Sequence, residues 1–177
     1  MTDKEHLTSL VVSAQTGKKD AFEEIFRLTR EHARKLAYSV VGAHHCEDVL
    51  QESYLLVYRK LRQLQKPEAF VGWLCRLVLH VAYRHKKKFP PNDELSDHLG
   101  DDDKTDSLVD ALVLRRVLAG MHPRDRDVLV LRELLGLSYE DLSHTLQLPL
   151  GTVRSRLNTA RKRLSERLTV GIRGNFP

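Results

Sequence analysis

The chain has 177 residues, of which 41% are hydrophobic, and it carries 29 Lys and Arg against 24 Asp and Glu. This length accommodates one domain or two small ones, and the hydrophobic content is sufficient for packed cores. The apolar runs are too short for a membrane span, the N-terminus lacks a secretory pattern, and two cysteines cannot build a disulfide framework. We therefore expect a folded protein of the cytoplasm.

Three helices are predicted in the first half of the chain, because its apolar residues recur at helical spacing without an alternating strand pattern. The first is predicted to begin at an Asp20 N-cap and to end at Gly42. The second should cover residues 45–61. The third should follow Pro67 and continue to about residue 88, with Trp73 on its core side.

Polar residues give the second and third predicted helices two different faces. On the second helix they form a compact patch of Glu47, Asp48, Gln51 and Glu52. An acidic patch on an otherwise basic body favours a protein partner over DNA. On the third helix the solvent side carries basic and aromatic residues, namely Arg76, His80, Tyr83 and Arg84. Cations suit a nucleic-acid backbone and rings stack on bases, so this face is typical of single-strand binding.

Charge divides the chain into three segments. Residues 1–88 have 16 basic against 10 acidic side chains, and residues 111–177 have 12 against 6. Between them, residues 89–110 hold one lysine, eight acids and few large apolar residues. This composition is typical of a flexible linker, and it also suits a solvated loop that only maintains solubility. Two basic bodies joined by an acidic linker suggest that a polyanion is contacted at two places.

The last segment predicts a helix-turn-helix. Ser138 is a suitable N-cap, and Asp141 three residues later can complete a capping box. The turn residues around Pro149 should end this helix, so that a second one starts there. The second helix has one narrow apolar stripe, made of Val153, Leu157, Ala160, Leu164 and Leu168. This layout is typical of helices that read DNA.

The opposite side of that second helix is polar and flanked by arginines. Its outer residues are Ser155, Asn158, Thr159 and Lys162, and its flanks carry Arg154, Arg156 and Arg161. This face offers hydrogen-bonding groups for bases and positive charge for phosphates. An ordinary surface helix of a basic protein can have a similar composition, so the pattern alone also fits that interpretation.

Together these motifs resemble those of an extracytoplasmic-function (ECF) sigma factor, a bacterial transcription initiation factor, over nearly the whole chain. The C-terminal similarity lies in LSYEDL (137–142), GTV (151–153) and SRL (155–157). The N-terminal similarity lies in FEEIF (22–26), EDVLQESY (47–54) and FVGWLCRLV (70–78). The resemblance implies an all-α protein with two small domains, 1–88 and 111–177, joined by the acidic linker 89–110. It also implies a non-catalytic subunit without a metal or cofactor.

The resemblance assigns a partner to each face. The polar patch Glu47, Asp48, Gln51 and Glu52 would bind core RNA polymerase at the β′ coiled coil, and the C-terminal domain would contact the β flap. Residues 63–84 would recognise and melt the minus-10 element, with Arg76, His80, Tyr83 and Arg84 on the DNA side. The minus-35 element would be bound by Thr152, Arg154, Ser155, Arg156, Asn158, Thr159, Arg161 and Lys162. An anti-sigma protein is a further implied partner.

Three positions depart from the family pattern. His80 stands where many members have Asn, so we expect a different preference in the minus-10 element. Thr159 stands where a basic residue is common, which removes a possible guanine contact worth roughly 1–3 kcal/mol. His122 precedes Pro123 where an apolar residue or proline is more usual, and no functional consequence is expected.

Two other classes of protein share some of these features. A free-standing helix-turn-helix repressor or activator would have the C-terminal helices but no need for the polar patch or the strand-binding face. A zinc sensor or metalloenzyme would draw on His44, His45, Cys46, Cys75 and His80. The spacing argues against it, because no short Cys or His pair is matched by a second one.

Overall fold

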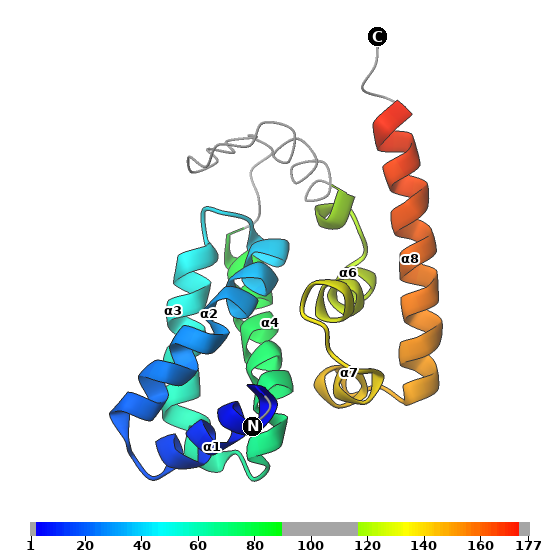
Figure 1. Cartoon of the computed structure of the whole chain (residues 1–177). Coiled ribbons are helices and arrows are strands. Elements are labelled where there is room, and N and C mark those ends of the chain that lie inside the picture. Colours follow the sequence, from blue (N-terminus) through cyan, green and yellow to red (C-terminus); the bar gives the residue numbers. More distant parts are fainter. Residues whose placement is uncertain (1–2, 90–116, 174–177) are drawn as a thin grey trace. The chain divides into compact units, whose positions relative to one another are not determined.

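The computed structural model describes residues 3–89 and 117–173, with side chains as far as Thr169. The regular elements in these ranges are helical (Figure 1), which confirms the all-α prediction. The chain divides into two compact units, residues 1–91 and 92–177. Most of the expected acidic linker, residues 90–110, lies outside the described residues.

The described part of unit 1 is a helical bundle. Its elements are α1 (Asp3–Gln15), α2 (Lys19–Val41), α3 (Cys46–Lys60), the 3-10 turns η1 (Leu61–Gln63) and η2 (Pro67–Ala69), and α4 (Phe70–Lys88). Helices α2, α3 and α4 confirm the three helices expected from the apolar spacing. Helix α1 was not expected from the apolar spacing; Val11 is fully buried, and the other side chains described for this helix, residues 4–10 and 12–15, are half-buried or exposed.

The two ends of α2 compare differently with expectation. Its N-cap is Lys18, and no side chain caps it, so the prediction of Asp20 as N-cap is wrong. Asp20 lies instead in the first turn, where its negative charge still interacts favourably with the helix dipole. At the other end Gly42 has φ 74°, and its amide donates to the carbonyl oxygen of Tyr38 at 2.9 Å. This is the expected glycine C-cap.

The core of unit 1 lies where α2 packs against α4, with α1 and α3 packed beside them (Figure 1). Ile25 and Leu36 of α2 are fully buried, as are Val78 and Val81 of α4. Trp73 is half-buried at the margin of this core. Because each helix buries one stripe of residues spaced three or four apart, its opposite side remains open to solvent. The polar sides of α3 and α4 are exposed in this way.

Unit 2 contains α6 (Pro123–Leu129), the π-helical turn η3 (Val130–Leu134), α7 (Tyr139–Leu146) and α8 (Leu150–Arg173). Pro123 occupies the first turn of α6, where its missing amide removes no helix hydrogen bond. The preceding residue, His122, is the N-cap, and its Nδ1 accepts a hydrogen bond from the amide of Arg124 at 3.3 Å. His122 therefore has a structural role that sequence reasoning did not find.

Helices α7 and α8 confirm the expected helix-turn-helix. Ser138 Oγ accepts a hydrogen bond from the Asp141 amide at 3.0 Å, and Asp141 Oδ2 accepts one from the Ser138 amide at 3.4 Å. This is the predicted capping box. The C-cap of α7 is Gln147, which has the left-handed backbone angles φ 54° and ψ 48°. Ser143 Oγ then donates to the Leu148 carbonyl oxygen at 2.6 Å and fixes the turn into α8.

Candidate nucleic-acid and polymerase interfaces

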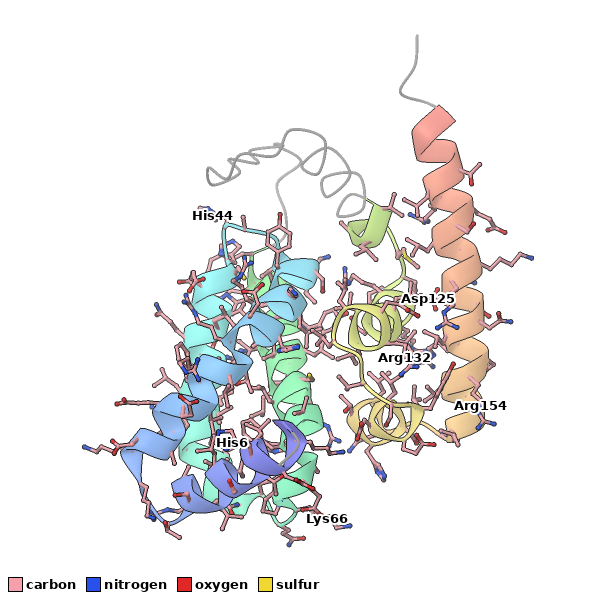
Figure 2. The ribbon with its side chains drawn as sticks, viewed as in Figure 1. His6, His44, Lys66, Asp125, Arg132 and Arg154 are labelled. Atoms are coloured by element: carbon pink, nitrogen blue, oxygen red, sulfur yellow. The ribbon has the colours of Figure 1, made fainter. Side chains whose placement is uncertain are left out.

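Helix α8 buries one narrow stripe and exposes most of the residues expected to contact DNA. Val153, Leu157 and Ala160 are fully buried, as predicted, and Leu164 and Leu168 are half-buried. The exposed side chains on the other side are those of Arg154, Ser155, Asn158, Thr159, Arg161 and Lys162. In Figure 2, Arg154 projects outward near the start of α8. The helix therefore presents hydrogen-bonding and cationic groups along one continuous surface.

Two of the expected DNA-binding residues are less accessible. Thr152 and Arg156 are half-buried, and the carbonyl oxygen of Thr152 accepts a hydrogen bond from Ser155 Oγ at 3.1 Å. Arg156 borders a cavity of about 400 Å³ in unit 2, whose lining residues are Arg124, Asp127, Leu146, Leu148 and Arg156. Arg156 thus lies on the flank of α8 that faces the rest of unit 2.

Two arginines of α8 form ion pairs within unit 2. Arg161 Nη2 lies 2.7 Å from Glu133 Oε1, and this hydrogen-bonded pair raises the pKa of the guanidinium further above its usual value. Arg163 pairs with Asp125, a buried carboxylate at the start of α6. Arg161 was expected to contact the DNA backbone. In the free protein its partner is instead Glu133, an acid of the segment that precedes α7. To bind a phosphate of the DNA, the Arg161 guanidinium would have to exchange its ion pair with Glu133 for one with the phosphate.

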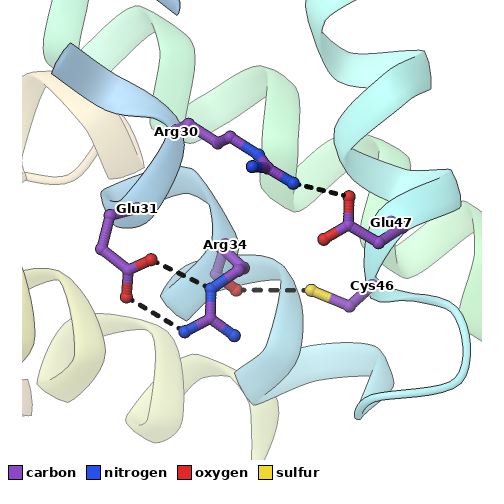
Figure 3. A network of polar contacts seen from close by, with 5 residues as sticks. All are labelled: Arg30, Glu31, Arg34, Cys46 and Glu47. Carbon is purple, nitrogen blue, oxygen red and sulfur yellow. Dashed lines mark hydrogen bonds and ion pairs between the residues drawn. The ribbon is translucent and has the colours of Figure 1, made fainter. Parts of the chain in front are cut away.

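The polar patch on α3 lies at its N-terminal end. Glu47, Asp48 and Gln51 are exposed, whereas Glu52 is half-buried. Figure 3 shows Glu47 paired with Arg30 of α2, with the Oε2 to Nη2 distance at 3.2 Å. Asp48 Oδ2 lies 3.9 Å from His45 Nδ1. Glu47, Asp48 and Gln51 are therefore accessible, whereas the half-buried Glu52 is held by ion pairs with α4.

Two exposed apolar residues continue the same stripe of α3, and sequence reasoning missed both. Leu55 and Tyr58 have exposed fractions of 55% and 61%. They follow Gln51 at intervals of four and three residues, so they lie on one helix face with it. Leu55 and Tyr58 are out of phase with the buried residues of α3, such as Val49 and Val57, and this spacing could have predicted their exposure. The Tyr58 ring also packs edge-on against Phe22 of α2, with centroids 5.2 Å apart.

The solvent side of α4 carries three of its four expected DNA contacts in exposed positions. Arg76, His80 and Arg84 recur every four residues and are exposed, while Tyr83 is half-buried. Arg84 forms an ion pair with Glu52 of α3. The structure therefore brings a residue expected to bind polymerase into direct contact with one expected to bind DNA.

Aromatic rings gather where the α2–α3 loop meets the end of α4. His45 and Phe89 stack with centroids 5.1 Å apart, His44 packs edge-on against His45 at 4.8 Å, and His85 lies 6.0 Å from Phe89.

Burial raises the pKa of Cys46 to about 11, so its thiol is neutral near pH 7. Within residues 3–89 and 117–169, no three His, Cys, Asp or Glu side chains are placed to share a metal ion.

The fold and the exposed surfaces are those of a helical protein with a helix-turn-helix in unit 2 and further polar surfaces in unit 1. Residues 25–88 match the family described as Sigma-70 region 2, and residues 111–164 match Sigma-70, region 4. The chain is 31% identical to the ECF RNA polymerase sigma-E factor of Haemophilus influenzae, over 90% of this chain and 94% of the relative. It is also 31% identical to the RNA polymerase sigma-H factor of Pseudomonas aeruginosa, over 95% and 96%.

The chain belongs to the ECF sigma factors, and it is an alternative sigma factor that directs transcription initiation. Solved structures share its fold. CnrH, in complex with the cytosolic domain of CnrY, has a TM-score of 0.76 at 22% identity, over 93% of this chain and 98% of that one. The sigma factor RpoE of Bartonella quintana, in complex with the anti-sigma factor NepR, has a TM-score of 0.70 at 24% identity, over 86% and 99%. No helix in the described ranges is long and apolar enough to cross a membrane.

Proposed function

We propose that this sigma factor acts through three separate helix faces, on α3, α4 and α8, and catalyses no reaction itself. The observation that carries this proposal is that each helix buries an apolar stripe and exposes most of the residues expected to bind a partner. We place its action in the cytoplasm, together with core RNA polymerase. The N-terminal domain (1–88) would bind core polymerase and the minus-10 element. The C-terminal domain (111–177), after the acidic linker, would bind the minus-35 element.

On α8, the minus-35 element would be bound in the major groove. Arg154 and Asn158 are exposed and suited to base edges, and Lys162 is suited to a phosphate. Arg161 would reach the backbone once Glu133 releases it. Thr159 offers a hydroxyl and a methyl group to the groove but no positive charge, so the preferred minus-35 sequence should differ from that of relatives with a basic residue there.

On α4, the minus-10 element would be opened by capture of separated bases. Exposed His80 and half-buried Tyr83 offer ring faces, and Arg76 and Arg84 offer positive charge for the strand backbone. Strand capture of this kind uses binding energy rather than nucleotide hydrolysis. With His80 in place of Asn, a ring replaces an amide at this surface, which supports a changed base preference.

On α3, the polar patch would bind the β′ coiled coil of core polymerase. The exposed carboxylates suit a basic partner surface, and Leu55 and Tyr58 add an apolar anchor on the same face. Aromatic anchors of this type often supply much of an interface's binding energy. Unit 2 would in addition contact the β flap.

An anti-sigma protein is a further proposed partner. RpoE was solved in complex with the anti-sigma factor NepR, and CnrH in complex with the cytosolic domain of CnrY; this chain shares their fold. An inhibitor would have to cover at least one of the three proposed faces in order to block initiation.

Run-off transcription with core RNA polymerase tests the proposed function. The full-length protein should direct initiation from a subset of a genomic promoter pool, and the protein without core enzyme should direct none. Arg154→Ala should reduce initiation from promoters with a native minus-35 element by roughly tenfold or more, which corresponds to loss of one bidentate contact. Arg167→Ala removes the same charge farther along α8 and is the matched control.

The outcome depends on the promoter used. Promoters that lack a minus-35 element should respond little to Arg154→Ala. Equal losses on both kinds of promoter would show that α8 does not read this element. Operator binding by the protein alone, without any effect on core polymerase, would instead identify a free-standing regulator.

A further inference from the structure

Side-chain hydrogen bonds attach the end of α1 to the segment between α3 and α4. The Nε2 group of Gln15 donates to the carbonyl oxygen of Leu61 at 2.9 Å and to that of Leu64 at 2.7 Å. Gln15 is half-buried, so these hydrogen bonds are partly shielded from water. One amide group therefore bridges two parts of the chain that are almost fifty residues apart.

The two carbonyl groups mark the turn in which the chain leaves α3. The Leu64 amide donates to the Leu61 carbonyl oxygen at 3.1 Å, and Leu64 then adopts extended backbone angles, φ −73° and ψ 105°. Lys66 is extended as well, as expected for a residue before proline. Carbonyl groups at a helix end need partners from outside the helix, and a carboxamide has two N–H donors. Gln15 thus fixes the turn and the extended residue together.

A second contact joins the same segments. Gly17, two residues after Gln15, has φ 97°, and a Cβ atom added to it would lie 3.5 Å from Nη2 of Arg62. The guanidinium group of Arg62 therefore lies against the α1–α2 turn, although its side chain is exposed. The end of α1 contacts both the backbone of the 61–66 segment and its arginine.

We infer that Gln15 is a positioning residue for recognition of the separated minus-10 strand. This inference rests on the proposed function of α4 and on the expected role of residues 63–84, which include the end of the 61–66 segment, in minus-10 recognition. Gln15 holds the 61–66 segment in one conformation before DNA arrives, so the segment does not have to be ordered when the strand binds. Restricting a binding segment to its bound conformation strengthens binding without any new contact to the ligand.

The fold of unit 1 does not depend on Gln15 in the same way. The attachment of α1 to the bundle rests on the fully buried Val11 and the half-buried Leu7 and Leu10, whereas Gln15 lies at the end of the helix. Loss of its two hydrogen bonds should therefore loosen the 61–66 segment more than it destabilises the unit.

The test uses holoenzyme made from core polymerase and the full-length chain. The variants are Gln15→Ala and Gln15→Glu, and the control is Thr16→Ala. The Thr16 hydroxyl of the wild type donates to the nearby Ser13 carbonyl oxygen at 2.7 Å, within the same end of α1. Two probes come from a promoter that wild-type holoenzyme transcribes: a single-stranded oligonucleotide with the minus-10 sequence, and a duplex with only the minus-35 element. Affinity for core enzyme and the thermal midpoint of the free protein are measured alongside.

Gln15→Ala should weaken single-strand binding about fivefold, the value of one typical net hydrogen bond. Gln15→Glu should weaken it further, because an ionised carboxylate has no donor and would face two carbonyl oxygens. The Gln15 variants should bind the minus-35 duplex and core enzyme as the wild type does. Thr16→Ala should match the wild type in every measurement. Wild-type binding of the single strand by Gln15→Ala would overturn the inference. Equal losses on both probes, in step with a lower thermal midpoint, would also overturn it.

A His80→Ala, Tyr83→Ala double variant separates this inference from the proposed function. If that variant binds the minus-10 strand normally, the proposed role of α4 fails, and the inference fails with it. If the double variant binds weakly while Gln15→Ala binds normally, only the role of Gln15 is wrong.

Discussion

Glu52 of α3 and His85 of α4 lie in direct contact, with 3.0 Å between Oε2 and Nε2. The same carboxylate also pairs with Arg84, so two successive residues near the end of α4 share one acid. Glu52 belongs to the proposed polymerase-binding patch, and Arg84 to the proposed minus-10 face. A partner that engages Glu52 would therefore compete with α4 and release Arg84 for the strand backbone.

Reversing the charge of Asp48 should weaken association with core polymerase. Asp48 is exposed, and its nearest ionic partner, His45, is 3.9 Å away, so Asp48→Lys should leave the fold intact. Like-charge contact at a protein interface is strongly unfavourable, and we expect a loss of affinity of about tenfold or more. Competition for core enzyme against a labelled sigma factor measures it. Glu23→Lys makes the same change on an exposed site of α2 and should have little effect.

Removing the charge of Glu133 should strengthen promoter binding. Glu133→Gln frees Arg161, which is otherwise held by the carboxylate that raises its pKa. Arg161 then reaches a phosphate without first leaving Glu133, so the affinity should rise, whereas Arg161→Ala should lower the dependence of the binding constant on salt by about one unit of slope. Titration of holoenzyme with promoter DNA at several salt concentrations gives this slope. An unchanged slope would argue that Arg161 does not reach the backbone.

The capping box of α7 should contribute measurably to the stability of unit 2. Ser138→Ala removes the hydroxyl that accepts a hydrogen bond from the Asp141 amide. Loss of a Ser N-cap lowers the free energy of unfolding by about 1 kcal/mol. Urea unfolding followed by circular dichroism measures the change. Ser165→Ala, at an exposed position in α8, should leave the unfolding curve nearly unchanged.

The buried hydroxyl pair Thr29 and Tyr54 should respond asymmetrically to mutation. The two oxygens are 2.8 Å apart, and Thr29 Oγ1 also donates to the Ile25 carbonyl oxygen at 2.7 Å. Thr29→Val would leave the Tyr54 hydroxyl buried without this partner, at a cost of roughly 1–3 kcal/mol. Tyr54→Phe should cost less, because Thr29 retains Ile25. Chemical denaturation of both variants checks the order, and equal costs would contradict it.

The same tyrosine should make stability depend on alkaline pH. Burial raises the pKa of Tyr54 to about 12, above the value of about 10 of an exposed tyrosine. The folded state therefore retains the proton more tightly, and its stability should fall between about pH 10 and pH 12. Cys46 and Cys75 add to this loss, with pKa values raised to about 11 and about 12 by burial. The difference between wild type and Tyr54→Phe isolates the contribution of Tyr54.

Local patterns of the sequence predict much of this fold. Ser138 and Asp141 interact across three residues, and Val153, Leu157 and Ala160 share one helix face, so both features follow from helix geometry alone. The N-cap predicted for α2 is wrong because Asp20 has a side chain suited to a cap, while the observed N-cap, Lys18, lies two residues earlier.

Contacts between distant residues could not be predicted in this way. Glu52 and Arg84 are 32 positions apart, and their pairing depends on how α3 packs against α4. The bridge from Gln15 to Leu61 requires α1, which the apolar spacing does not reveal. Exposed Leu55 and Tyr58 were passed over because an apolar residue in a helix is usually expected to be buried.

The left-handed backbone conformation of Gln147 determines which substitutions the turn between α7 and α8 can accept. Its φ of 54° is accessible to asparagine and glycine at lower strain than to most residues, and its side chain is exposed. The angle between α7 and α8 depends on this backbone conformation and not on the chemistry of the glutamine side chain. Glycine at this position should therefore preserve the orientation of α8, whereas a β-branched residue should disturb promoter reading from a position outside the proposed DNA-binding residues.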